Sequence, residues 1–193
     1  GGPGGYPPGG GGYPPEETIR VDCGVAQQQP GFNPLADALQ RIAPGGVIYV
    51  RAGGTACNES LYITQPVTIV GEGIPAFATG PNPQPAALAP PQGKPAILVD
   101  EGVKGVEIRD LIIECRQARD SACIETYNAD VALTRVQVRY QGNASAIYAS
   151  GGRVLLRESD ITAQTYDPAV VADGVMTQIS DTVIRGESVG LDI

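Results

Sequence analysis

The second half of the chain repeats one pattern of apolar and polar positions four times, beginning at residues 95, 121, 144 and 168. Each repeat opens with a short apolar run after a small residue, and then continues with a run in which apolar and polar residues alternate. The equivalent apolar positions are spaced 25, 23 and 23 residues apart. They are Ile108, Leu133, Leu156 and Ile179, and then Ile113, Val138, Ile161 and Ile184.

A period of this length, with short β-branched runs and no helical periodicity, predicts a β-solenoid. Each repeat would form one coil of two or three short parallel strands, stacked at the ordinary strand spacing of about 4.8 Å. Leucine-rich repeats have a similar length, but their fixed pattern of Leu and Asn is absent. A fifth repeat begins at Val189, Gly190 and Leu191.

The first part of the chain fits the same architecture. Residues 18–22 predict a strand, and residues 33–42 predict a short helix with Asn33 as its N-cap and Pro34 in its first turn. Residues 43–45 would stop this helix. Its apolar residues fall on one face, so we expect it to cover the open core of the first coil. Those residues are Leu35, Ala38, Leu39 and Ile42. The strands of the first coil are predicted at residues 47–50, 61–64 and 67–70.

Glycine and proline account for 43 of the 193 residues, and they are concentrated in two places. Residues 1–15 read GGPGGYPPGGGGYPP, which predicts a separate flexible segment over residues 1–17. Residues 74–95 hold seven prolines and predict one extended loop that leaves the regular body and rejoins it. The β-helix domain would therefore span residues 18–193, with this loop inserted.

Three stretches near the start carry a resemblance to a known family. They are GGVIYV at residues 45–50, NESLYI at residues 58–63 and QPVTIVGEG at residues 65–73. Together they resemble the opening of the pectin-lyase-like proteins, which include pectin methylesterases and periplasmic copper-maturation β-helix proteins. The resemblance implies an all-β, right-handed parallel β-helix of about 5–6 coils with a short N-terminal capping helix. It indicates the fold and not an activity, because binding, structural and catalytic proteins share it.

Composition and motifs argue against several functions. The chain has no His, which excludes Ser-His and Cys-His catalysis and His-ligated zinc. Its net charge of −8 argues against nucleic-acid binding, and no apolar run of 18 residues predicts a membrane span. No run resembles the Gln-Asp-Thr-Leu, Asp-Phe-Ile-Phe-Gly or Arg-Pro-Trp motifs of pectin methylesterases, and the Arg-Pro segment of pectate lyases is missing. We therefore assign no catalytic, cofactor-binding or metal-binding residue.

Two sets of residues remain as weak candidates for chemistry. Asp110, Arg135, Glu158 and Asp181 occupy equivalent positions in successive coils. The carboxylates of Glu158 and Asp181 would lie one strand spacing apart, as in a retaining glycosidase or a calcium site, although a solvated charge ladder is the simpler interpretation.

The second set could form a sugar-stacking platform. It consists of Tyr127, Tyr140, Tyr148 and Tyr166. Because their offsets from the repeat differ, scattered surface tyrosines are the simpler interpretation.

The four cysteines predict two disulfide bonds. Cys115 ends one coil and Cys123 starts the next, while Cys23 follows the first strand and Cys57 lies in the turn after the opening strand of the first coil. We expect Cys23 to pair with Cys57 and Cys115 with Cys123; four buried thiols are the alternative. Disulfide bonds would place the protein outside the cytoplasm, either secreted, at the cell surface or in the periplasm.

Two functions remain open. The alternation of Val189, Leu191 and Ile193 continues to the last residue with no polar cap, which suggests a structural protein that associates head-to-tail into a homo-oligomer or filament. Tyr6 and Tyr13 would contact the neighbouring subunit. The alternative is a β-helix that binds or modifies an extracellular polysaccharide, such as a polyuronate. The absence of family motifs favours a role without catalysis, and we expect no cofactor.

Overall fold

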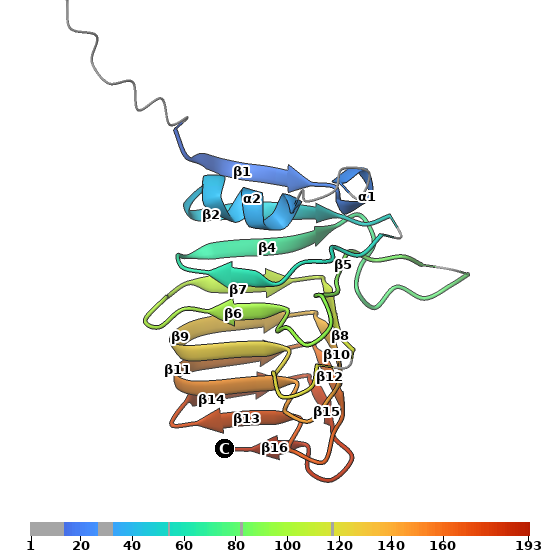
Figure 1. Cartoon of the computed structure of the whole chain (residues 1–193), viewed down its shortest axis with the longest axis vertical. Coiled ribbons are helices and arrows are strands. Elements are labelled where there is room, and N and C mark those ends of the chain that lie inside the picture. Colours follow the sequence, from blue (N-terminus) through green and yellow to red (C-terminus); the bar gives the residue numbers. More distant parts are fainter. Residues whose placement is uncertain (1–13, 27–32, 54, 82, 117) are drawn as a thin grey trace, which may run out of the picture.

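The chain folds into a stack of coils with three sides (Figure 1). The structure is a computed structural model, and it describes residues 14–26, 33–53, 55–81, 83–116 and 118–193. All the strand pairs formed by these residues are parallel. The strands of successive coils form two sheets, and the larger sheet bends to make two of the three sides. We name the three sides faces A, B and C.

Each face is defined by its strands. Face A contains β3 (Leu61–Ile63), β6 (Ile97–Val99), the first parts of β9 (Ile124–Thr134) and β11 (Ile147–Arg157), β13 (Val170–Asp173) and β16 (Leu191–Asp192). Face B contains β1 (Glu16–Val21), β2 (Ile42–Arg51), β4 (Val67–Glu72), β7 (Val106–Arg109), the second parts of β9 and β11, and β14 (Met176–Ser180). Face C contains β5 (Ala87–Leu88), β8 (Ile112–Cys115), β10 (Gln137–Gln141), β12 (Asp160–Gln164) and β15 (Val183–Arg185).

The repeat positions predicted from the sequence stack on one another in the structure. On face B, Ile108 pairs with Leu133, Leu133 with Leu156, and Leu156 with Ile179. On face C, Ile113 pairs with Val138, Val138 with Ile161, and Ile161 with Ile184. These side chains fill the interior of the stack and are fully buried except in the last coil. The fifth repeat is also present, because Leu191 pairs with Val170.

The number of coils was underestimated, since the structure has about seven turns. Residues 47–50 and 67–70 were expected in the same coil, but Ile48 pairs with Ile69 on face B, so they belong to successive coils. The strand β1 also forms a coil of its own, in which Ile19 pairs with Ile48. The spacing between these residues is irregular because helices or a loop are inserted between the strands, which hid the repeat.

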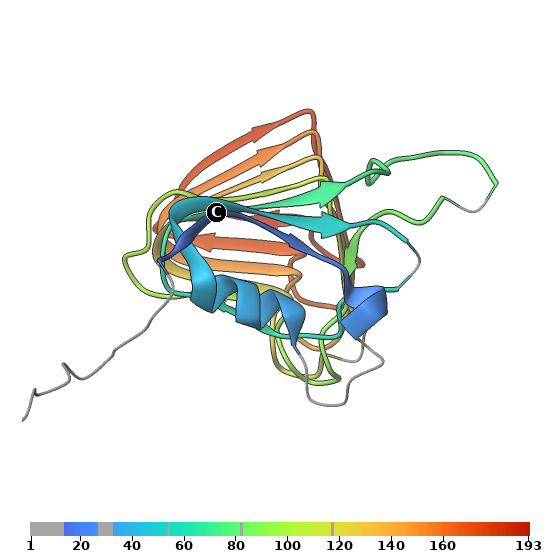
Figure 2. The ribbon, with the colours of Figure 1, turned by 90° about the horizontal axis from the view of Figure 1, so that it is seen from above.

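Two helices replace strands in the first coil, and the longer one was predicted. α1 (Cys23–Ala26) follows β1, and α2 (Pro34–Arg41) lies along one side of the coil, against β1, β2 and β3 (Figure 2). Leu35 and Ala38 of α2 are buried, which confirms its apolar face. α2 ends at Arg41, before the predicted stop, because Ile42 already has an extended backbone and begins β2.

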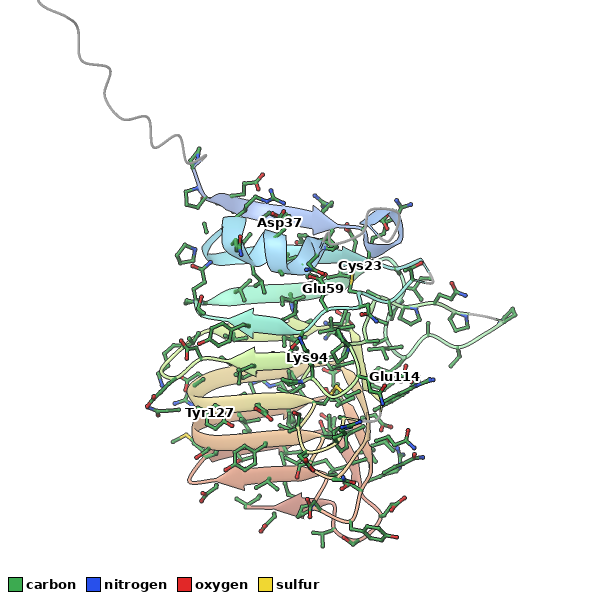
Figure 3. The ribbon with its side chains drawn as sticks, viewed as in Figure 1. Cys23, Asp37, Glu59, Lys94, Glu114 and Tyr127 are labelled. Atoms are coloured by element: carbon green, nitrogen blue, oxygen red, sulfur yellow. A yellow bond between two sulfur atoms is a disulfide. The ribbon has the colours of Figure 1, made fainter. Side chains whose placement is uncertain are left out.

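Asn33 occupies the predicted N-cap position of α2, but another residue caps the helix with its side chain. Asn33 makes no side-chain hydrogen bond to the helix. The amides of Leu35 and Ala36 instead donate to the carboxylate of Glu59, each at 2.9 Å. Glu59 is only 5% exposed, and it lies beneath α2 (Figure 3). A buried carboxylate from the next coil therefore satisfies the first turn of the helix.

Both predicted disulfide bonds are present. Cys23 of α1 is bonded to Cys57, which lies two residues before Glu59. Cys115, the last residue of β8, is bonded to Cys123, which directly precedes β9. The first bond fixes the helical coil to the coil below, and the second closes the loop between two coils.

The proline-rich segment projects from the stack between β4 and β6 (Figure 1). It was predicted as a single loop, but it contains β5, which pairs with β8 and gives this coil its strand on face C. Residues 1–13, including Tyr6 and Tyr13, lie outside the described residues, so the proposed boundary at residue 17 stays a prediction. No helix of the described residues is long and apolar enough to cross a membrane.

Candidate functional site

The outer surface of face A carries three tyrosines, on β3, β9 and β11. In β3, Leu61 and Ile63 point into the core, and Tyr62 between them points outward and is 53% exposed. Strand pairing aligns Tyr62 with Leu98, Leu98 with Glu125, and Glu125 with Tyr148. Tyr127 lies two residues after Glu125 on β9 and is 40% exposed. The period of two in these strands thus places the three rings on one side.

A cleft of about 630 Å³ opens between these strands. Its lining residues come from β3, β6, β9 and β11 and from the turns that follow them. They are Tyr62, Leu98, Val99, Asp100, Glu101, Tyr127, Asn128, Ser150 and Gly151. The volume is in the range of sites that take small ligands, roughly 300–1,000 Å³, and the lining combines rings with carboxylate, amide and hydroxyl groups. We call this site the tyrosine cleft.

The backbone at one wall of the cleft has an unusual conformation. Asn128 has φ 47°, and the residue next to it one coil below, Gly151, has φ 68°. These residues turn β9 and β11 from face A to face B without breaking the strand pairing. The turn leaves Tyr127 at the end of face A (Figure 3).

The rings of Tyr127 and Tyr148 contact each other, and carboxylates lie near Tyr127 and Tyr62. The rings of Tyr127 and Tyr148 are tilted by 53° with their centroids 6.1 Å apart, a favourable edge-to-face type of arrangement. Burial raises the pKa of Tyr127 above its ordinary value of 10.0, and the charge of Glu125 raises it further. The pKa of Tyr62 is also raised, first by a hydrogen-bonding interaction with the Asp100 carboxylate. Both phenols therefore stay protonated at neutral pH.

The four tyrosines considered in the sequence do not form one platform, because only two of them lie together in the structure. Tyr127 and Tyr148 come together, but Tyr140 faces the interior, where its hydroxyl donates to the carbonyl of Ser121 at 2.8 Å. Tyr166 is 87% exposed and does not line the cleft. Tyr62, which completes the site, was missed because it lies outside the four repeats. Its position between two apolar residues of a strand was the available signal.

The corner between faces B and C carries the predicted charge ladder. Asp110, Arg135, Glu158 and Asp181 all have positive φ, between 47° and 53°. Arg135 forms two hydrogen bonds with the Asp110 carboxylate, at 2.8 and 3.1 Å.

The proposed carboxylate pair receives no support as a metal site. Glu158 and Asp181 follow the paired residues Arg157 and Ser180, so they are neighbours in successive coils, and both are exposed. No group of three metal-ligating side chains occurs among the described residues. The pair stays a prediction.

Several apolar side chains at the C-terminal end of the described stack are exposed. Val189 is 46% exposed and Ile193 is 73% exposed, as are Met176 and Val183 at 65% and 45%. Leu191 is half-buried, whereas Val170, its partner one coil earlier, is 1% exposed. The residues predicted for self-association therefore share one surface, apart from the two in the part of the chain that is not described.

Comparisons with known proteins identify the fold. No protein-family model matches the chain, and no curated protein matches it. A crystal structure of a pectin methylesterase mutant in complex with a hexasaccharide matches with a TM-score of 0.54 and 17% sequence identity. The match covers 80% of this chain and 55% of that one, so the chain spans about half of its length. The chain thus has the pectin-lyase-like β-helix fold.

Proposed function

We propose that the chain is a carbohydrate-binding β-helix protein that holds a saccharide in the tyrosine cleft without catalysis. The cleft carries the proposal, because exposed tyrosine rings offer flat apolar surfaces to sugar rings while nearby carboxylate, amide and hydroxyl groups accept or donate hydrogen bonds. The hexasaccharide bound to the similar pectin methylesterase supports the same class of ligand. The two disulfide bonds support a location outside the cytoplasm, where polysaccharides are found.

Replacing the exposed tyrosines is expected to weaken saccharide binding. Each of Tyr62→Ala and Tyr127→Ala should lower affinity roughly 10-fold or more, the usual effect of removing an aromatic anchor. The affinity is measured by calorimetric titration with hexasaccharides of glucose, N-acetylglucosamine, glucosamine and galacturonic acid. Tyr166→Ala is the matched control, since it removes an exposed tyrosine outside the cleft. Equal affinity for all three variants, or no binding of any hexasaccharide by the native chain, contradicts the proposal.

Self-association is a second candidate function, favoured by the exposed last coil. Among the described strands, β14 pairs only with β11, and β1 pairs only with β2. Both lie on face B, so pairing of β14 in one copy with β1 in another would continue the same parallel sheet. Such a contact is head-to-tail and would build a filament or oligomer.

Light scattering of the purified chain tests self-association directly. We expect a mass that rises with concentration, and we expect Leu191→Asp and Ile193→Asp to lower it because a charge would have to be buried in the contact. Glu187→Asp serves as a control on the same coil. A monomer at all concentrations up to about 100 μM, roughly the weak end of specific association, contradicts this function.

A further inference from the structure

Acidic side chains gather around face A without basic partners. Nine carboxylates of the described residues form ion pairs with an arginine or lysine, and they are distributed over the rest of the stack. Asp100 and Glu101, which line the tyrosine cleft, form none with any described residue, and neither does Glu125. These three carboxylates therefore carry negative charge that no ion pair among the described residues compensates.

A second cleft, of about 250 Å³, adjoins the tyrosine cleft across the pair of Tyr127 and Tyr148. It lies at the other end of the face A strands, and Tyr148 and Glu125 form part of its lining. Its remaining residues include two more carboxylates, Asp120 and Asp167. We call this site the acidic cleft.

The carboxylates of the acidic cleft lie close enough to the buried Tyr140 to affect the pKa of its phenol. Burial raises the pKa of its phenol most, and the charges of Asp167, Asp120 and Glu125 raise it further. Its hydroxyl is held by the Ser121 carbonyl and by the amide of Ala144 at 2.9 Å, both next to the acidic cleft. The negative charges of three carboxylates thus act on the Tyr140 hydroxyl, which is fixed by two hydrogen bonds next to the acidic cleft.

The charge of the two clefts restricts the ligands they accept. Neither lining contains an arginine or lysine among the described residues. A polyuronate carries one negative charge per sugar, so five unpaired carboxylates and a net charge of −8 would repel it. A sugar with a protonated amine would be attracted to the carboxylates, and its cationic group would also be favoured over a tyrosine ring.

We infer that the ligand of face A is a cationic saccharide, an oligomer of amino sugars with free amines, which spans both clefts. The inference rests on the proposed function, because it names the class of saccharide that the tyrosine cleft would bind. The sugar rings would lie on Tyr62, Tyr127 and Tyr148. The amines would lie near Asp100, Glu125 and the two carboxylates of the acidic cleft.

Titration with three hexasaccharides tests the inference. At mildly acidic pH, where the amines of the sugar are protonated, the glucosamine hexamer should bind at least 10-fold tighter than the N-acetylglucosamine hexamer. Raising the salt from about 0.1 M to about 1 M should reduce this preference, because it shortens the range of the electrostatic attraction. The galacturonic acid hexamer should bind weakest, with or without added calcium.

Charge-removing variants separate the amine preference from saccharide binding itself. Glu125→Gln and Asp100→Asn should each lower affinity for the glucosamine hexamer several-fold more than affinity for the acetylated hexamer. Glu158→Gln is the matched control, because it removes the same charge at the corner between faces B and C. A reduction of equal size in this control would mean that only net charge matters, which overturns the inference.

The outcomes distinguish the two proposals. Equal binding of the glucosamine and N-acetylglucosamine hexamers overturns the cationic ligand and leaves carbohydrate binding standing. Tighter binding of the galacturonic acid hexamer does the same. If no hexasaccharide binds to the native chain, both proposals fail.

Discussion

Replacing Gly152 by alanine is expected to be among the most destabilising single substitutions in the chain. Gly152 has φ 81°, and it lies where β11 turns from face A to face B beside Ala129 of the coil above. A Cβ atom at this position would overlap the backbone carbonyl and amide of Ala129, which cannot move without disturbing the strand pairing. We expect Gly152→Ala to lower the free energy of unfolding by at least about 3 kcal/mol.

The neighbouring glycine provides the control for this experiment. Gly151 also has positive φ, but a Cβ there would meet Asn128 only at an ordinary contact distance of 3.5 Å. Gly151→Ala therefore tests the backbone conformation alone and should cost about 1 kcal/mol. Thermal unfolding followed by circular dichroism measures both, with Gly152→Ala lowering Tm by about 6 °C or more. Equal shifts in Tm would show that the close approach to Ala129 is unimportant.

The second large effect is expected at the carboxylate below α2. Glu59→Ala would leave the amides of Leu35 and Ala36 without their acceptor, and the bond from Leu35 is fully buried. Each buried donor without a partner costs roughly 1–3 kcal/mol, and the negative charge at the helix N-terminus is lost as well. We expect a loss of about 3 kcal/mol in the free energy of unfolding, measured by urea denaturation.

Asn33→Ala is the matched control for the helix cap. Asn33 occupies the N-cap position, but its side chain makes no bond to the helix, so the substitution should change stability by less than about 0.5 kcal/mol. A larger loss for Asn33→Ala than for Glu59→Ala would contradict the assignment of Glu59 as the cap.

The sequence was sufficient to predict the stacking of the regular coils, because a solenoid places equivalent residues of neighbouring repeats side by side. Leu133 and Val138 contact the residues expected from the 25- and 23-residue spacings. Both disulfide bonds could be predicted for a related reason, since each joins residues of adjacent coils.

The first coils and the site were harder to predict because they depend on contacts with no fixed spacing. The helices between β1 and β2, and the long loop before β7, change the distance between equivalent positions, so the coil count was too low. Glu59 caps α2 from 24 residues away, and local cap rules cannot detect it. The tyrosine cleft combines Tyr62 with residues one to three coils further on, which only the three-dimensional stack brings together.

The proline-rich loop lengthens the chain between two coils without changing how the strands of these coils pair. Ile69 and Ile108 are direct strand partners although 39 residue numbers separate them, because the loop leaves after β4 and the chain returns in register. Lengthening a surface loop costs little free energy once its ends are fixed, about 0.6 kcal/mol for each doubling of its length. This corner of the coil can therefore accept insertions or deletions of many residues, so that its surface can diversify between related chains while the interior stays unchanged.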